Sequence, residues 1–490
     1  MQDGTLLAAV DLGSNSFRLE IGRYELGYIQ RVHYLKETVR QGAGLDEERN
    51  LSPEAMQRGW DCLERFAERL QGVAPAQVRA VATQTLREAR NRDVFIARAN
   101  ALLGHAIEVV SGPEEARLIY QGVSHLLPPS QERRLVLDIG GRSTELILGQ
   151  QYEAHEMVSL RLGSVAWSAR FFAAGELTTQ AFEEAQTAAR AQIDEVLAMF
   201  RPGLWDVAYG SSGTVGAVGD ILAQCGRPAG RITRADLLWL EQQLLRAGHV
   251  SRVQLAGLKD DRRPVIGGGL CVLRALFDAL DIEELQVAQG ALRQGLLYDM
   301  VSRESPATDL RSAAVAALSH RFGVEVAQAQ RVAEVAQQLF AQVAPGQEGA
   351  ALQLAWAAQL HELGCRIAHS GYHRHGAYIL EHTDAAGFAR GELQSLARLV
   401  RAHRGKLRKL ELDWEDATFV LQLACLRLAV ALCHARCMPD LDGLRLLRKG
   451  QVLQLRARGG WAAAYPQSAH LLREECMDWQ RTPWVLGMEA

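Results

Sequence analysis

Two short stretches carry residues whose types and spacing could do chemistry: VDLGSNSF at 10–17 and LDIGGRSTEL at 137–146. In each, an acidic residue ends an apolar run, and a turn rich in Gly and Ser follows. A carboxylate at a strand end can hold a hydrated metal ion or position a water molecule, while the N–H groups of such a turn can point at one anion. Gly13, Gly140 and Gly141 suit backbone conformations that a β-carbon would penalise. Two such turns, facing each other across a cleft, would grip a phosphate chain from both sides.

Further segments supply groups that would suit the same cleft. VAYGSSGT at 207–214 is a third apolar strand that ends in a hydroxyl-rich turn ahead of a helix, a place where anions bind. Arg87 stands at the mouth of a strand, where its guanidinium could clamp phosphate oxygens. Glu114 and Glu115 fall in the first turn of a predicted helix, where compensation of the helix dipole explains them as well as catalysis does. A single copy of this motif would more often be an ordinary β-turn. Two copies, each at the start of a similar α/β region, favour phosphate binding.

The hydrophobic pattern predicts the scaffold that would position these groups. Strands and helices alternate through the first 127 residues, including a helix that opens with Ser52 as cap and Pro53 at its first position. A Pro-Pro-Ser break at 128–130 ends this series, and RRLVLDIGG starts it again. GGG at 267–269 is either a further strand-to-helix turn or, with equal weight, a packing site. We therefore expect two related α/β domains with mixed sheets, at residues 1–125 and 126–303.

The character of the sequence changes after these two domains. Residues 304–440 are rich in Ala and Leu with a 3.6-residue period, which predicts a helical domain. Residues 441–490 contain a hairpin pattern, LRLLRKGQVLQLRARGG, followed by a short helix and a final strand. We expect this segment to form a small C-terminal α+β domain.

Composition bounds the class of protein. The chain has 490 residues, of which 48% are hydrophobic, and this fits an ordered protein of several domains. Its formal net charge of −3 gives no sign of binding to a polyanion through the charge of the whole chain. No apolar window is long enough for a transmembrane helix, and the N-terminus lacks the basic region of a signal peptide. The scattered cysteines show no second metal-binding pair and favour reduced thiols. We expect a cytoplasmic protein, with peripheral membrane association left open.

Six motifs, in order and spacing, resemble the exopolyphosphatase / guanosine pentaphosphate phosphohydrolase family: DLGSNSF, TLREA, SGPEEARLIYQGV, DIGGRSTEL, GSSGT and GALRQGLLYDM. The resemblance spans essentially the whole chain. That family belongs to the actin-like, sugar kinase and Hsp70 ATPase superfamily, with a phosphate cleft between two duplicated domains. The resemblance thus implies an α/β fold of two actin-like, ribonuclease H-like domains, followed by an all-α degenerate HD-like domain and the small C-terminal domain.

The resemblance also implies an activity, namely hydrolysis of the terminal phosphoanhydride of polyphosphate in the cleft, with release of orthophosphate. Glu115 would be the catalytic base, Asp138 a Mg²⁺ ligand, and Glu145 a holder of metal or water. K⁺ is a candidate activator. The expected phosphate path is formed by Arg87, Asp11, Gly13, Ser14, Asn15, Ser16, Gly140, Gly141, Arg142, Ser143, Thr144, Ser212, Gly213 and Thr214.

Arg142 is a departure from the family pattern, which has a small residue at that position of the turn. Its side chain could point out of the cleft, contact phosphate, or narrow the channel. We favour the first of these.

The helical domain holds a cluster of histidines between 361 and 403. His361 is followed by Glu362, where true HD enzymes carry a His-Asp pair, so we expect packing rather than metal binding and no chemistry. The domain could hold the polyphosphate tail through basic patches that include His375, Arg404 and Lys406, by release of counterions. A solvated helix end explains these patches equally well.

Several alternatives stay open on the sequence. The active-site motifs do not separate polyphosphate from pppGpp as substrate; HSGYHRHGAYIL at 369–380 resembles the exopolyphosphatase branch, so polyphosphate is favoured, with dual activity as a variant. A sugar or acetate kinase would need an acceptor signature, which we do not find. A non-hydrolysing actin-like switch would bind ATP tightly. No nucleic-acid partner is expected, since aromatic residues do not interleave with the basic patches, and the resemblance suggests a homodimer.

Overall fold

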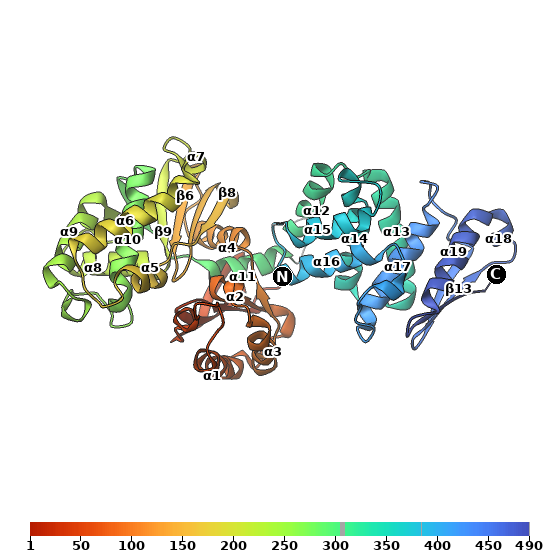
Figure 1. Cartoon of the computed structure of the whole chain (residues 1–490), viewed down its shortest axis with the longest axis horizontal. Coiled ribbons are helices and arrows are strands. Elements are labelled where there is room, and N and C mark those ends of the chain that lie inside the picture. The colour runs from red at the N-terminus through yellow and green to blue at the C-terminus, as the bar shows by residue number, and fades with distance from the viewer. Residues whose placement is uncertain (304–308, 384, 490) are drawn as a thin grey trace. The chain divides into compact units, whose positions relative to one another are not determined.

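The computed structural model describes residues 1–303, 309–383 and 385–489, and the chain divides into two compact units, Met1–Thr308 and Asp309–Ala490 (Figure 1). The start of the predicted helical domain, at residue 304, lies outside the described residues. Among the described helices, none combines the length and the apolar character needed to cross a membrane.

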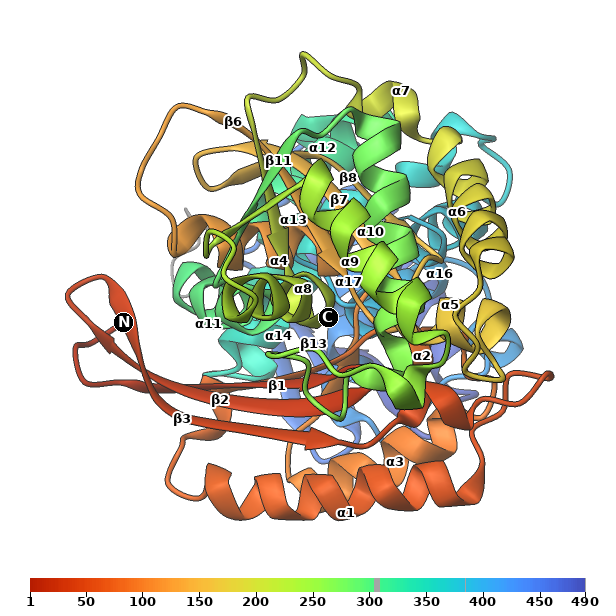
Figure 2. The same ribbon diagram turned by 90° about the vertical axis from the view of Figure 1, so that its left-hand side faces the viewer.

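The first unit begins with a five-stranded sheet in the order β3-β2-β1-β4-β5. The strands are β1 (Leu6–Leu12), β2 (Ser16–Glu25), β3 (Tyr28–Thr38), β4 (Val78–Ala82) and β5 (Ile107–Val109). β1 to β3 form an antiparallel meander, while β4 and β5 run parallel to β1. Helices α1 (Pro53–Leu70) and α3 (Arg92–Leu103) cover one face of this sheet (Figure 2). α1 begins as predicted, because the Ser52 hydroxyl accepts a hydrogen bond from the Ala55 N–H.

The second sheet repeats the order of the first. Its order is β10-β11-β9-β6-β7-β8, so that β8-β7-β6-β9-β11 matches β3-β2-β1-β4-β5, with β10 added at the edge. The strands are β6 (Arg133–Ile139), β7 (Thr144–Gln150), β8 (Glu153–Leu160), β9 (Val207–Ser211), β10 (Arg231–Thr233) and β11 (Glu284–Val287). The predicted duplication of two α/β domains with mixed sheets is confirmed.

Helices of the second domain are α5 (Ser164–Phe171), α6 (Thr179–Asp194), α7 (Leu197–Phe200), α8 (Ser212–Gln224), α9 (Arg234–Ala247) and α10 (Ile266–Leu280). The three glycines at 267–269 lie inside the first turn of α10, so of their two predicted roles, a strand-to-helix turn and packing, the structure bears out packing. A β-carbon on Gly268 would lie 2.5 Å from the Ser168 backbone nitrogen, so these glycines are needed where α10 packs on α5.

Two helices, α4 (Gly112–His125) and α11 (Leu292–Arg303), lie between the sheets (Figure 1). One hydrophobic cluster joins them to both sheets, through residues such as Ala9 of β1 and Ile147 of β7. The helices touch backbone to backbone, because a β-carbon on Gly295 would lie 1.8 Å from the Leu118 carbonyl oxygen. The contacts between the two domains therefore include the close packing of these helices.

Buried charge reinforces the contact of the two helices. In α11, Asp299 accepts a 2.7 Å hydrogen bond from Arg117 of α4 and pairs with Arg79 of β4. Against the effect of burial, these guanidinium groups hold the pKa of Asp299 well below its usual range. Removal of one partner of such a network is strongly destabilising, because a buried charge is left uncompensated.

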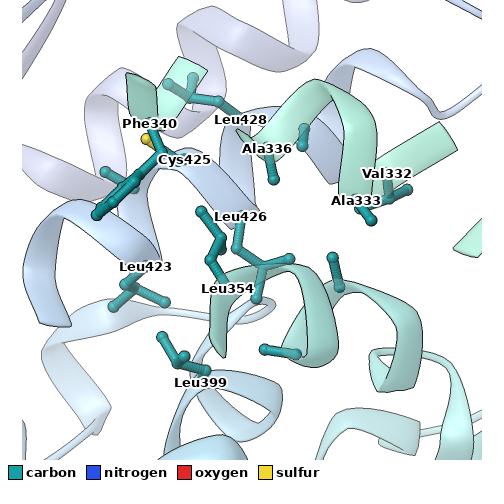
Figure 3. Close-up of a cluster of buried hydrophobic side chains, with 14 of the residues drawn as sticks. Val332, Ala333, Ala336, Phe340, Leu354, Leu399, Leu423, Cys425, Leu426 and Leu428 are labelled. Carbon is teal, nitrogen blue, oxygen red and sulfur yellow. The ribbon is translucent and has the colours of Figure 1, made fainter. Parts of the chain in front are cut away.

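The second unit is helical with a small sheet. Its helices are α12 (Leu310–Arg321), α13 (Val326–Val343), α14 (Glu348–Leu360), α15 (Tyr372–Glu381), α16 (Arg390–Ala402), α17 (Ala417–Leu432), α18 (Trp461–Ala464) and α19 (Pro466–Trp479). The sheet consists of β12 (Leu444–Lys449), β13 (Val452–Ala457) and β14 (Val485–Glu489). Figure 3 shows part of its apolar core, which includes Phe340 and Leu426. The core continues into the sheet through Leu453, so helices and sheet share one interior.

The glycine contact between α4 and α11 generates a prediction. Gly295→Ala should lower the free energy of unfolding by about 1–3 kcal/mol, since the added methyl meets backbone that cannot move aside. Urea unfolding of the full chain measures this change. Gly216→Ala in α8 is the control, because a β-carbon there meets no atom within 4 Å and should be neutral or stabilising. Equal stability of both variants would contradict the backbone contact.

Candidate active site

A cavity of about 80 Å³ lies between the two α/β domains of the first unit. Its lining brings together most of the predicted site residues: Asp11, Gly13, Ser14, Asn15, Ser16, Glu115, Asp138, Gly140, Gly141, Ser143, Ser212 and Gly213. The two turns face each other closely, since a β-carbon on Gly141 would lie 3.1 Å from the Ser14 β-carbon.

The glycines of the turns serve a different purpose from the one predicted. Within the described chain, none of Gly13, Gly140 and Gly141 has a positive φ. A β-carbon would instead be crowded, at 3.0 Å from the Ser16 carbonyl for Gly13 and 3.1 Å from the Ser143 carbonyl for Gly140. The expectation of a special backbone conformation is wrong, and close approach is the reason for glycine.

The third turn is attached to the second one. Ser212 has φ 72°, a left-handed conformation that costs a non-glycine residue energy and is common at functional sites. The hydroxyls of Ser212 and Thr214 donate to the Ile139 carbonyl, at 2.7 and 2.9 Å. Thr214 is thereby turned away from the cavity. Thr144 also lies outside the cavity lining, because its hydroxyl donates to the Leu162 carbonyl at 2.5 Å.

Buried carboxylates concentrate on the side of the second domain. Asp138 of β6 and Glu145 of β7 are direct cross-strand partners, and both are almost fully buried. Ser211 donates to Asp138, and Ser159 donates to Glu145 at 2.7 Å. Burial raises the pKa of both groups, and the charges of Glu115 and Asp138 raise that of Glu145 further. Like charges directly opposite each other in a sheet are unfavourable, so this pair is retained at a cost in stability.

The equivalent position in the first domain is compensated. Asp11 of β1 lies opposite Arg18 of β2, with 3.8 Å between carboxylate and guanidinium. Arg293 of α11 approaches the same carboxylate at 3.5 Å. The two copies of the motif therefore differ, because only the second copy presents negative charge without an opposing strand partner.

Glu115 lies in the first turn of α4 and lines the cavity. Arg87 donates to its carboxylate at 2.6 Å and to the Val110 carbonyl at 3.0 Å, from outside the cavity lining. Burial raises the pKa of Glu115, while Arg87 opposes that effect. The neighbouring Glu114 instead accepts two hydrogen bonds from Arg117 and lies outside the cavity lining, so Glu115 is the one of the two that faces the cavity.

Several lining residues escaped the sequence analysis. Arg18, Thr83, Arg262 and Arg293 all face the cavity. Arg293 lies in the GALRQG motif and Arg18 follows the first turn directly, so adjacency to a motif could have indicated both. Arg262 packs on the third turn, where a β-carbon on Gly213 would lie 2.2 Å from its guanidinium.

Several hydrogen-bond donors around the first turn lack partners. Among the described residues, the Asn15 amide nitrogen, the Ser16 hydroxyl and the Arg18 Nε are buried without a hydrogen-bond partner. Thr85 donates to the Ser14 hydroxyl at 2.8 Å, which leaves the Ser14 proton to be donated elsewhere. Buried polar groups are almost always satisfied in native proteins, so an anion bound in the cavity could give these donors the partners that they lack.

Arg142 does not point away from the cleft, and that expectation is wrong. Its guanidinium donates to the Glu88 carboxylate at 2.8 and 3.1 Å and to the Gly42 carbonyl at 3.2 Å. Both partners belong to the first domain. The side chain thus bridges the cleft outside the cavity lining.

Of the three residues predicted to bind the polyphosphate tail, two line the same cavity of the second unit and the third does not. Arg404 and Lys406 line a cavity of about 700 Å³, but so do the acids Glu474, Glu475 and Asp478, so the patch is not simply basic. His375 packs against the main chain at Gly364 and lies outside that lining.

Two histidines of this unit are buried side by side. His361 and His403 lie with ring centroids 5.4 Å apart, and each uses Nδ1 to contact a backbone carbonyl at 2.6 Å. Burial lowers the pKa of both, and the neighbouring His361 lowers that of His403 further. Packing of neutral rings is the role these contacts support.

A magnesium ion would fit the first cavity. In the described part of the chain, no group of three or more His, Cys, Asp or Glu side chains could enclose a metal ion by itself. Mg²⁺ needs only one or two carboxylates, because it keeps water and binds substrate phosphate oxygens. Asp138 lines the cavity and is the carboxylate that such an ion would contact first, while Glu145, directly opposite it on β7, lies outside the lining.

Comparison with known proteins identifies the family. The profile of the Ppx/GppA phosphatase family matches residues 21–304, and that of Ppx/GppA phosphatase domain III matches residues 310–476. The chain belongs to the Ppx/GppA phosphatase family. Its curated relatives include proteins named guanosine-5'-triphosphate,3'-diphosphate pyrophosphatase. The Vibrio vulnificus protein is 40% identical over 99% of this chain and 98% of its own, and the Pseudoalteromonas translucida protein is 38% identical over 98% and 97%.

Solved structures share the fold of the first unit. An exopolyphosphatase-like protein is 25% identical with a TM-score of 0.56, over 61% of this chain and 98% of that one. An exopolyphosphatase from Cytophaga hutchinsonii is 24% identical with the same TM-score and coverage. The Ppx/GppA family member of Aquifex aeolicus is 23% identical with a TM-score of 0.52, over 61% and 99%.

The buried histidine pair predicts a pH dependence of stability. The folded state keeps both rings neutral, while an unfolded chain protonates them below about pH 6.5. The unfolded state then binds more protons, so stability is fully present above that pH and falls below it, by up to about 1.4 kcal/mol per pH unit for each ring. Urea unfolding at pH 7.5 to 5.5 measures the slope. His403→Gln should flatten it, and His382→Gln, at an exposed position, should not; equal slopes would refute the assignment.

Proposed function

We propose that this protein hydrolyses the terminal 5'-phosphoanhydride of pppGpp, releasing orthophosphate and leaving ppGpp. The observation that carries the activity is the cavity in which Glu115 faces two glycine-rich turns and unpaired donors. The choice of substrate rests on the full-length similarity to proteins named for pppGpp. The sequence favoured polyphosphate over pppGpp as the substrate, and this similarity reverses that preference. It outweighs the resemblance of the HSGYHRHGAYIL segment to the exopolyphosphatase branch.

Hydrolysis in this cavity follows from the position of Glu115. A water oxygen attacks the terminal phosphorus while its proton passes to the Glu115 carboxylate. The bond from phosphorus to the bridging oxygen breaks in line, and the electron pair stays on the departing diphosphate. The raised pKa of Glu115 suits a base that must accept a proton near neutral pH.

The remaining groups bind and orient the phosphate chain. Ser14, Asn15 and Ser16 offer donors from the first turn, and Arg18 and Arg293 add positive charge. Donors preorganised in a water-poor site stabilise the charge of the transferring group. Asp138, with Glu145 opposite it on β7, would hold Mg²⁺, which would supply further charge neutralisation when bound.

A second chamber adjoins the first and supports a nucleotide substrate. It encloses about 350 Å³ and shares Arg18, Arg262 and Arg293 with the inner cavity. Beyond these, Tyr34 and Lys259 line it. The inner cavity suits one terminal phosphoryl group, and the outer chamber has room for the groups attached to it.

Exopolyphosphatase activity is the second candidate. The inner cavity recognises a terminal phosphate and not the group behind it, and solved structures of this fold carry the exopolyphosphatase name. The outer chamber carries guanidinium groups that would also bind inner phosphates of a polymer. Cytoplasmic localisation, K⁺ activation and dimer formation stay predictions.

Substrate preference is tested by phosphate release from pppGpp, long-chain polyphosphate and ATP in parallel, with Mg²⁺ present. We expect the highest kcat/KM for pppGpp. A higher kcat/KM for polyphosphate would make exopolyphosphatase the first candidate function, and the assignment of the active site would not change. Tight ATP binding without hydrolysis of any substrate would favour the actin-like switch and contradict hydrolysis.

Glu115→Gln tests the assignment of the base. The change keeps the shape of the side chain and removes its ability to accept a proton, so kcat should fall about 10²–10⁴-fold with little change in substrate affinity. Glu114→Gln is the neighbouring comparison, which should act mainly on stability because Glu114 pairs with Arg117. Turnover that survives Glu115→Gln would refute the role.

The proposed Mg²⁺ site is tested without turnover. Mg²⁺ should raise the thermal midpoint of the wild-type protein, because an ion that binds the folded state stabilises it. Glu145→Gln should raise the midpoint in the absence of metal, by removing a like charge, and should lose most of the Mg²⁺ effect. An undiminished Mg²⁺ shift in that variant would place the ion elsewhere.

A further inference from the structure

Arg142 connects the phosphate-binding turn of the second domain to the first domain. Its guanidinium binds one oxygen of Glu88 through two nitrogens, and a third nitrogen donates to the Gly42 carbonyl. Gly42 makes room for it, because a β-carbon there would lie 3.0 Å from the Arg142 Cδ. Both ionic side chains are mostly shielded, at 24% and 12% exposure, so the pair is less screened than a surface ion pair.

The contact continues from Glu88 to the proposed base. The second Glu88 oxygen accepts from the Gln84 amide nitrogen at 2.6 Å. The Gln84 carbonyl oxygen accepts from Arg87 at 2.6 and 3.0 Å. Arg87 then donates to Glu115 at 2.6 Å. An unbroken series of hydrogen bonds therefore runs from Arg142 through α2 (Gln84–Glu88) to Glu115.

The order of donors and acceptors fixes each member of this series. Gln84 must face Glu88 with its nitrogen and Arg87 with its oxygen, because a carboxylate only accepts and a guanidinium only donates. A rotated amide would place donor against donor and acceptor against acceptor. Gln84 is itself buried, so it has few other partners to choose from. Against the effect of burial, Gln84 and Arg142 lower the pKa of Glu88, which keeps it ionised as the series requires.

We propose that Arg142 is a positioning residue that holds Glu115 through Glu88, Gln84 and Arg87. This rests on the proposed function, in which Glu115 is the base. The series is complete only while the turn at 140–143 is docked on the first domain.

The test is steady-state kinetics of Arg142→Gln, Arg142→Lys and Glu88→Gln, on whichever of pppGpp, polyphosphate and ATP the wild-type protein hydrolyses fastest. Loss of the base's alignment should lower kcat about 10–100-fold while KM changes little, since Arg142 does not line the cavity. Arg142→Lys keeps the charge without the fork and should be intermediate. The Arg142→Gln/Glu88→Gln double variant should be no slower than the slower single variant, because both changes break one series.

Asp261→Asn is the matched control. It removes another ion pair between the same two domains, Lys36–Asp261 at 2.7 Å, together with a 4.0 Å contact of Asp261 with Arg262, and neither contact touches the series. Its kcat should stay within about twofold of wild type. If Asp261→Asn lowers kcat as much as Arg142→Gln does, or if the effects of Arg142→Gln and Glu88→Gln multiply, Arg142 merely holds the domains together and the proposal fails. An unchanged kcat in Arg142→Gln would also overturn it, whereas a wild-type protein that hydrolyses none of the substrates would overturn the proposed function as well.

Discussion

The charge on three buried carboxylates is the constraint on which the rest of the first unit depends. Glu115, Asp138 and Glu145 are each no more than 7% exposed, and they raise one another's cost of ionisation. Arg87 is the guanidinium paired directly with this group, through Glu115. Such a concentration of like charge is unfavourable by itself, and under the proposed function a cation bound together with the phosphate would relieve it. The fold must therefore shield the three carboxylates from water and keep them close to one another.

The duplicated domains form the frame that holds these carboxylates in place. The two copies differ in the charges that they present to the cavity. The first copy opposes Asp11 with Arg18, which makes a nearly neutral wall with donors pointing inward. The second copy opposes Asp138 with Glu145, which makes an anionic wall. Under the proposed function, the phosphate would lie between the wall that donates hydrogen bonds and the wall whose carboxylates would hold its counter-ion. The helices α4 and α11 keep the two walls in register through backbone contact at Gly295.

Much of this was predictable, because strands, caps and turns are local properties of the sequence. The two domains, the Ser52 cap and the C-terminal hairpin follow from hydrophobic period and turn residues. The cavity lining at the three turns was predictable from their repeated glycine- and serine-rich pattern, although the first turn follows β1 of one sheet and the other two follow β6 and β9 of the other. The positions of GGG at 267–269 and the true reason for Gly13 were not, because both depend on which elements pack together rather than on the adjacent residues.

Side chains that act across the cleft were the hardest to place. Arg18, Arg262 and Arg293 come from three separate elements, and only the closed arrangement of domains makes them one group. Arg142 was expected to point out of the cleft, because a long cation in a tight phosphate turn has no local partner. Its partner, Glu88, is supplied by the other domain. The departure from a small residue at this position is therefore compatible with an intact cavity. The guanidinium lies outside the phosphate path and connects the two domains. Its position could not be predicted from neighbouring residues, because its partner belongs to the other domain.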